Sequence, residues 1–480
     1  MAMAKRMVFA AVVLATAATA SAQERRTQEV GGEARASANV TIYNNDLALV
    51  RETRAVELSS GITALRWMDV ASTVRPETVH VADADSAAAF GVLEQNYKYD
   101  VLNPTRLMEL YLNRQLTLVT TNPATGAEQS EQATQLSTQD YAYVYRTDEG
   151  ITFGHPGRVV FPEVPANFVA RPTLEWLLDC REPGRRTIEA SYLASGMSWN
   201  ADYVLVLNDN DTQGDITGWV TLRNNAGIGF EGAGLQLVAG RVNIVTATTG
   251  YAYPMGQAMY AAAPAPPAEP QFAEEGMFEY HLYTLQRPTD LMDREQKQIE
   301  LLGADAIAIE KKFKLEGDSY YYVSQYTGAM ENLPVFVWIE FVNSDDNGMG
   351  MPLPAGTVRL YKTDVHGGQQ FIGEDAIDHT PREERVKLRI GQAFDVVAER
   401  KQTDYEVLSD TLYETEWEIT LRNRKAEPIV VEIHEPMAGD WEVLSASHEW
   451  TKEAAMMLQF DVPVRPDQEV VVTYRVRTRY

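Results

Sequence analysis

The sequence has little cysteine, a shortage of positive charge and no long hydrophobic run. Its 480 residues include one cysteine, Cys180, which excludes a disulfide framework and a cysteine zinc site. Lysine and arginine together number 42 against 68 aspartates and glutamates, so the net charge is −26. Such an acidic protein repels phosphate backbones, and we expect no nucleic-acid partner. The 45% of hydrophobic residues suffices for the cores of about three domains.

The first residues have the three parts of a secretory signal peptide. Lys5 and Arg6 precede a short apolar run, Met7–Ala15, and small residues lead to an A-S-A sequence ending at Ala22. This run is shorter than the roughly 20 residues of a membrane-spanning helix, and no later stretch qualifies. Cleavage after Ala22 removes both basic residues and changes the net charge to −28. We expect a periplasmic or secreted mature protein without a transmembrane segment.

Alternating apolar and polar residues predict strands along most of the mature chain. Val40–Tyr43 and Leu47–Val50 flank a polar turn, and similar segments recur at roughly 8–12-residue spacing. Asn103 and Pro104 fit the cap and first turn of one helix. Asp290–Phe313 mixes helix-favouring residues with alternation, and we predict that most of it is extended. The fold class we predict is all-β, with tandem antiparallel, immunoglobulin-like β-sandwich domains and one or two short helices.

The sequence divides into four predicted regions. They are a signal peptide at 1–22, an N-terminal β-rich domain at 38–170, a central β-sandwich region at 171–400 and a C-terminal β-sandwich at 401–480. Within the central region, residues 250–277 are rich in proline and alanine. Such a segment favours neither strand nor helix, so we predict a disordered insertion.

A short internal repeat supports stacked domains of one kind. Trp219–Asn224 resembles Trp417–Asn423, and Phe341–Asn343 repeats its end. In each case we expect a strand to finish on asparagine and a polar turn to follow, because asparagine tolerates left-handed geometry and bonds its own backbone.

Motifs that identify a reaction are missing from the sequence. It has no G-x-S-x-G elbow, phosphate loop, H-E-x-x-H or dinucleotide fingerprint. Asn208–Asp215 resembles half of a calcium loop, but Val220 stands where the bidentate glutamate is needed. We predict a solvated acidic turn there.

The densest polar cluster is Gly373–Pro381, which contains Asp375, Asp378 and His379. Two carboxylates beside an imidazole are able to bind a divalent metal or relay protons, so these three are the candidate metal ligands. The alternative is a structural turn, in which Asp378 caps backbone donors, His379 packs its ring and Pro381 fixes the exit. The sequence identifies no catalytic residue, no cofactor-binding residue and no cofactor.

Several segments after about Arg171 carry a further signal. They are Tyr192–Tyr203, Leu237–Gly240, Glu279–Tyr283, Gly350–Gly356, Asp378–Pro381 and Ala393–Asp395. These segments are similar to those of the exported bacterial family called domain of unknown function 4139, some of whose members are labelled mucoidy-inhibitor-like. A weaker match covers the N-terminal part. The resemblance implies a β-rich envelope protein and brings no established catalytic residues.

The function expected from the sequence is non-enzymatic binding or scaffolding in the cell envelope. The partner would be an envelope protein or a polysaccharide. The alternative is a metal-assisted hydrolase that uses Asp375, Asp378 and His379. A cleft with convergent polar groups distinguishes the enzyme, whereas a scaffold presents strand edges and flat faces.

Limited proteolysis tests the predicted insertion. We expect a protease to cut within Tyr251–Gly276 early, because a segment without stable backbone pairing is accessible, and to leave two fragments associated through their sheets. Gel electrophoresis and mass spectrometry of the fragments measure this. Survival of the segment while other loops are cut would contradict the prediction.

Overall fold

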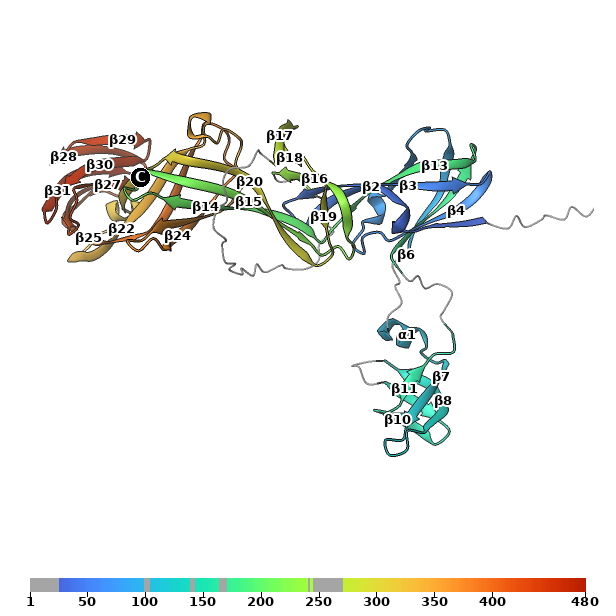
Figure 1. The fold of residues 1–480 in the computed structure, drawn as a ribbon. Coiled ribbons are helices and arrows are strands. Elements are labelled where there is room, and N and C mark those ends of the chain that lie inside the picture. Colours follow the sequence, from blue (N-terminus) through green and yellow to red (C-terminus); the bar gives the residue numbers. More distant parts are fainter. Residues whose placement is uncertain (1–25, 99–103, 139–142, 164–170, 241, 245–270) are drawn as a thin grey trace, which may run out of the picture. The chain divides into compact units, whose positions relative to one another are not determined.

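A computed structural model describes residues 26–98, 104–138, 143–163, 171–240, 242–244 and 271–480 (Figure 1). The predicted signal peptide, Asn103 and residues 250–270 of the predicted insertion lie outside these ranges. The described chain consists mainly of β-strands, so the all-β prediction is confirmed. Its one α-helix, α1 (Pro104–Leu110), begins at the predicted proline. The finer prediction of immunoglobulin-like sandwiches stays a prediction.

The strands form five sheets, in spatial order as follows. The first is β1 (Arg26–Val30), β4 (Gly61–Met68), β12 (Thr173–Cys180) and β6 (Phe90–Lys98). The second is β10 (Gly150–Phe153), β9 (Val144–Thr147), β8 (Glu128–Ser137), β7 (Gln115–Thr121) and β11 (Arg158–Val160). The third is β17 (Phe272–Met277), β18 (Tyr280–Leu285), β16 (Phe230–Ala239), β2 (Arg35–Tyr43), β3 (Leu47–Leu58), β13 (Gly184–Ala194) and β5 (His80–Asp83), with β19 (Thr289–Leu291) on β16.

All strands of the last two sheets lie after residue 196. The fourth is β20 (Glu295–Ala308), β15 (Gln213–Asn224), β14 (Met197–Leu207), β23 (Gly356–Thr363) and β24 (Gln369–Ile377). The fifth has nine strands: β28 (Asp440–Ala446), β31 (Glu469–Arg479), β26 (Leu412–Asn423), β25 (Arg385–Ser409), β22 (Ala329–Val342), β21 (Glu310–Glu316), β27 (Ile429–Pro436), β30 (Met457–Val464) and β29 (Trp450–Ala454). None of the helices in the described ranges has the length and apolar character of a membrane span.

The chain divides into two compact units. Unit 1 comprises the described residues within 26–36, 53–70 and 81–190, and unit 2 comprises those within 37–52, 71–80 and 191–480. The chain passes from one unit to the other within β2, β3, β5 and β13 and between residues 70 and 71. Residues 400 and 401, where the sequence predicted a domain boundary, both lie within β25.

Unit 1 has a core built on paired tryptophans. Trp67 of β4 and Trp176 of β12 are fully buried and meet edge to face, with ring centroids 5.9 Å apart. The buried Arg54 guanidinium lies 4.3 Å from the centroid of Trp67 and donates to the carbonyls of Val30 and Met68. A second, smaller core lies between α1 and the sheet of β7 and β8, where Met108 is buried. The alternating pattern of the sequence therefore places large aromatics inward, as a strand period of two requires.

The segments of unit 2 that carried the family resemblance pack against one another. The buried Tyr203 hydroxyl donates to the carbonyl of Pro354 at 2.8 Å, and the Tyr283 hydroxyl donates to that of Pro352 at 2.9 Å. Gly356 follows this proline segment, and a Cβ there would lie 2.2 Å from the Ala201 carbonyl oxygen. Only glycine allows β23 to approach β14 this closely.

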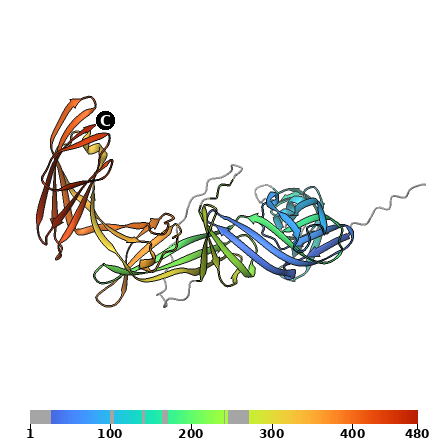
Figure 2. The ribbon, with the colours of Figure 1, turned by 90° about the horizontal axis from the view of Figure 1, so that it is seen from above.

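The nine-stranded sheet curls around one core. Side chains from strands far apart in the sheet meet inside it, such as Trp417 of β26 and Phe460 of β30. The edge strands also approach each other, because Trp441 of β28 and Trp450 of β29 have ring centroids 6.2 Å apart. In Figure 2 the red strands of this sheet curve around a common interior.

An ion pair lies inside this core. Arg400 of β25 and Glu435 of β27 are both 0% exposed, and their two hydrogen bonds measure 2.8 and 2.5 Å. Tyr322 donates to the same carboxylate at 2.5 Å and lies 3.0 Å from the Tyr474 hydroxyl. Burial, with the nearby carboxylate of Glu435, raises the pKa of both tyrosines well above the ordinary value. A Cβ at Gly317 would lie 2.3 Å from this carboxylate, so glycine leaves room for it.

Three asparagines end strands, as the internal repeat predicted. Asn224 ends β15, Asn423 ends β26, and Asn343 directly follows β22; all three are buried. The first two make the same contacts: the side-chain oxygen accepts from the N–H two residues on, and the amide donates to the carbonyl four residues on and to a carbonyl of a distant segment. These partners are Ala226, Ile228 and Leu291 for Asn224, and Lys425, Glu427 and Val464 for Asn423. The repeat therefore marks a local structure that ties a turn to another part of the unit.

Two segment predictions have different outcomes. Asp290–Phe313 is largely extended as predicted, in β19, β20 and the start of β21. The end of the predicted insertion is wrong, because Phe272–Met277 forms β17, hydrogen-bonded to β18 along its whole length. The neighbouring strand supplies backbone partners through a tight turn in which Phe278 has a φ of 58°. Local composition gave no sign of that pairing.

Substitution of the buried ion pair tests its energetic role. Arg400→Met leaves the Glu435 charge buried without a partner of opposite charge, so we expect the free energy of unfolding to fall by about 3–5 kcal/mol. The double variant Arg400→Met, Glu435→Met removes both charges and should lose less than the sum of the two single variants. Urea denaturation measures both, with Arg424→Met on the exposed surface as control. Additive losses would show that the two side chains do not act as a pair.

Candidate functional site

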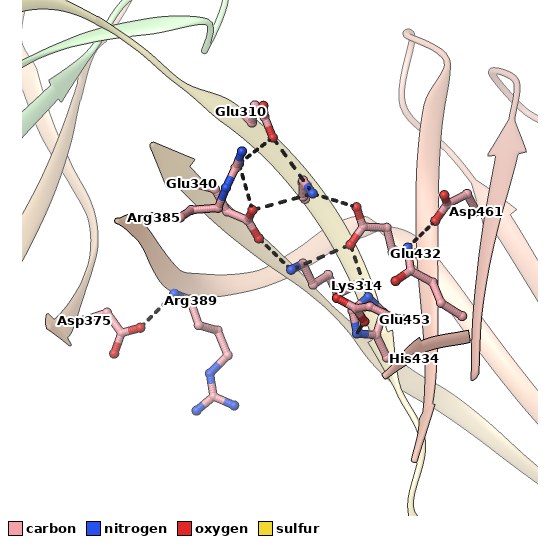
Figure 3. A network of polar contacts seen from close by, with 12 residues as sticks. Glu310, Lys314, Glu340, Asp375, Arg385, Arg389, Glu432, His434, Glu453 and Asp461 are labelled. Carbon is pink, nitrogen blue, oxygen red and sulfur yellow. Dashed lines mark hydrogen bonds and ion pairs between the residues drawn. The ribbon is translucent and has the colours of Figure 1, made fainter. Parts of the chain in front are cut away.

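A network of charged side chains lies on β21, β22 and β27, on the face of β21 opposite to the core residues Phe313 and Leu315 (Figure 3). Lys312 and Lys314 project from the same face of β21, because residues two apart in a strand share a face. Glu340 of β22 and Glu432 of β27 flank them, and the backbone register aligns Lys314 with Glu432. Charges of opposite sign therefore alternate across three neighbouring strands.

The contacts in this network link each charged group to one or more partners of opposite sign. Lys314 Nζ lies 2.7 Å from a Glu340 oxygen and 3.6 Å from one of Glu432, while Lys312 Nζ lies 3.1 Å from the other Glu432 oxygen. Arg385 joins Glu340 to Glu310, at 3.4 and 2.9 Å. Lys314 and Glu340 are only 6% and 2% exposed. Each buried charge thus has a partner of opposite sign.

The pKa values of the network follow from these contacts. His434 donates to Glu432 at 3.2 Å, since a carboxylate only accepts. This hydrogen bond, the one from Lys312 and the charges of Lys312 and Lys314 outweigh burial and lower the pKa of Glu432 to about 2. Burial favours a higher pKa for Glu340, but the hydrogen bond and charge of Lys314 hold its pKa below the ordinary value. Both carboxylates are therefore ionised at neutral pH. Shifts of this kind occur at catalytic sites and in structural ion-pair networks, and the mutual pairing here is that of a structural network.

The sequence-predicted residues are not brought together. Asp375, on β24, accepts from the backbone N–H of Ala376 at 2.9 Å and from that of Arg389 at 2.8 Å (Figure 3). Asp378 and His379 are exposed, and His379 Nδ1 accepts from the Ala355 N–H at 3.1 Å. In the described ranges no three histidine, cysteine, aspartate or glutamate side chains are grouped to hold a metal.

The structural-turn alternative for this cluster is also corrected in detail. Asp375 rather than Asp378 receives the backbone donors, because it lies within the sheet beside β25. His379 does not pack its ring in a core, because the chain has left the sheet by this residue.

The acidic turn Asn208–Asp215 has contacts that the sequence did not predict. Asn208 Oδ1 accepts from the N–H groups of Thr212 and Gln213, at 3.0 and 3.3 Å. Asp211 binds the ammonium groups of Lys311, at 2.6 Å, and Lys362. Burial would raise the pKa of Asp211, but these two hydrogen bonds lower it below the ordinary value. The carboxylate is thus half-buried and doubly paired rather than simply solvated.

A cavity of about 300 Å³ opens beside this turn. Its polar lining includes Asp211, Asp395 and three lysines, Lys311, Lys362 and Lys425. The apolar lining comes from four strands and the end of β14: Leu207, Phe313, Val337, Ile339, Ile372, Ile390, Ala393 and Phe394. Asp375, Asp378 and His379 are not among its lining residues. A concave apolar site with a few convergent polar groups is the usual form of a ligand site.

Sequence reasoning missed this cavity because its lysines come from β21, β23 and the turn after β26. Each is a single lysine among alternating residues, and no local motif joins them. Cys180, in contrast, is buried as the sequence suggested, and burial raises the pKa of its thiol. A neutral buried thiol is a small apolar side chain rather than a nucleophile.

Comparison with known proteins gives no family for this chain. No protein-family model matches it, and no curated protein matches it. The resemblance noted in the sequence stays a prediction.

The charged network predicts acid sensitivity. The folded-state pKa of Glu432 lies below its ordinary value of 4.5, so its stabilising effect is present above about pH 4.5 and is lost as pH falls toward 2. We expect Glu432→Gln to lower the free energy of unfolding at pH 7. The difference in this free energy between the variant and the wild type should become smaller as the pH falls. Urea midpoints between pH 7 and 2 measure this, with exposed Glu449→Gln as control. A difference that does not change with pH would contradict the prediction.

Proposed function

We propose that this protein is an exported cell-envelope protein that binds or scaffolds other molecules and does not catalyse a reaction. The cavity in unit 2 carries the proposal, because it combines an apolar wall with three lysines in a concave site. The signal-peptide pattern that ends at Ala22 supports export to the periplasm or beyond. For a protein in the periplasm or outside the cell, the partner is an envelope protein or a polysaccharide.

The pairing of the charged groups supports binding over catalysis. A general acid or base needs access to its substrate proton and a pKa near the working pH. Glu432, with a pKa of about 2, is bound to His434 and Lys312. Arg400 and Glu435 are sealed inside the core. These charged groups pair with one another and stabilise the sheet. They therefore do not act as general acids or bases toward a substrate.

The contacts of the candidate metal ligands favour binding over the hydrolase alternative. A metal-assisted hydrolase would need Asp375, Asp378 and His379 to converge on one cation with an open position for substrate. Asp375 uses both carboxylate oxygens for backbone N–H groups, and His379 Nδ1 accepts another. None of the three lines the cavity.

Two measurements on the mature chain test the proposal. We expect the tagged protein to retain a specific partner from an envelope extract, identified by mass spectrometry against a tag-only control. We also expect Zn²⁺ and Mn²⁺ to leave the melting temperature unchanged, since a cation that binds only the folded state would raise it. A rise that disappears in His379→Ala, but persists in the exposed control His366→Ala, would favour the hydrolase.

A further inference from the structure

We propose that the cavity in unit 2 binds a small organic monoanion, a carboxylate with an alkyl or aromatic body, through its lysines and its apolar wall. This inference deepens the proposed binding function and rests on it. It names the chemical class of one ligand.

The first observation is the arrangement of two lysines around one carboxylate. Lys311 Nζ lies 2.6 Å from one oxygen of Asp211, and Lys362 Nζ binds the other oxygen. Lys362 also donates to the Asp209 carbonyl at 3.0 Å. The pair carries two positive charges against one negative charge, and these contacts fix both ammonium groups at the cavity. A preorganised donor loses little conformational entropy when it binds an anion.

The second observation is that a third lysine, Lys425, lies near the same aromatic ring as Lys311. The ammonium groups of Lys311 and Lys425 lie 5.7 and 6.0 Å from the ring centroid of Phe313. Lys425 also lies 3.4 Å from the exposed Glu427, an ion pair of the surface type that contributes little free energy. A ligand carboxylate at the cavity is therefore able to compete for Lys425.

The charges of the lining favour a monoanion. Three lysines against Asp211 and Asp395 leave one positive charge in a protein whose net charge is −26. A locally positive site on such an acidic surface is selective for anions, and an apolar wall strengthens the attraction by lowering the local dielectric constant.

The wall specifies the body of the ligand. The wall has a hydrocarbon surface formed by Val337 and Ile339 of β22 and Ile390 of β25. Phe394 also lines the cavity, and 96% of its surface is exposed to solvent. An exposed phenylalanine loses its contact with water when an apolar group covers it, which favours binding. A volume of about 300 Å³ lies at the small end of ligand sites, so the occupant is one small molecule.

Calorimetric titration with three probes tests the inference. The probes are 2-naphthoate, which has both features, 2-naphthylmethanol, which has the apolar body alone, and acetate, which has the charge alone. We expect 2-naphthoate to bind at least about tenfold more tightly than either other probe, because a charge-assisted hydrogen bond adds to apolar burial. Raising the salt concentration should weaken naphthoate binding, since part of the attraction is electrostatic.

Three variants of the full mature chain locate the site. Lys425→Gln should weaken naphthoate binding about tenfold, and Phe394→Ala should weaken it severalfold. Lys401→Gln makes the same charge change at an exposed residue that is not among the cavity lining, and it should leave the affinity unchanged. Circular dichroism confirms that each variant is folded.

Two results would overturn the inference. Equal affinity for naphthoate and naphthylmethanol would show an apolar cavity without anion selectivity. No binding of naphthoate, or equal losses in Lys425→Gln and Lys401→Gln, would show that the lysines pair with Asp211 and Glu427 for structural reasons only. If a partner is still retained from the envelope extract, the ligand class fails alone and the proposed function stands.

Discussion

The nine-stranded sheet depends on the ion pair between Arg400 and Glu435. Removing two charges from water costs several kcal/mol for each ion, and the core tolerates this only because the partners bond bidentately and Tyr322 adds a third hydrogen bond. The pair joins β25 to β27, strands separated in the sheet by β22 and β21. A shift of register by one residue in either strand would move one charge to the outside. Only the present register therefore keeps both charges paired inside an otherwise apolar interior.

Charged side chains are stabilised in different ways on the two faces of this sheet. Inside, one pair is isolated from water and is supported by aromatic rings, with the guanidinium of Arg400 4.7 Å from the centroid of Tyr321. Outside, Lys314, Glu340 and Glu432 share their charges with several neighbours, so no single contact has to be ideal. The outer network permits long charged side chains on a face that is largely covered. In the cavity, by contrast, lysines and apolar side chains line the same hollow.

Alternation of apolar and polar residues predicted the strands of this protein well, and the repeat that ends on asparagine predicted a shared local structure. Both are local signals, written within a few residues. The candidate metal cluster was also a local signal, and the described residues contain no such group. Asp375 lies on β24, whereas Asp378 and His379 follow the end of that strand and are exposed, so residues that are close in sequence do not converge. The cavity lysines present the opposite case, because Lys311 and Lys362 come from strands of two different sheets, β21 and β23, and meet at Asp211.

The contact between Trp441 and Trp450 joins the two edge strands of the nine-stranded sheet. An open sheet margin is a template on which another chain adds a strand, and long margins of this kind promote aggregation. Here β28 and β29 bring their tryptophans within 6.2 Å of each other. The curvature of the sheet thus brings its two edge strands together with an aromatic pair between them. A strand added at either edge would have to pack beside this pair.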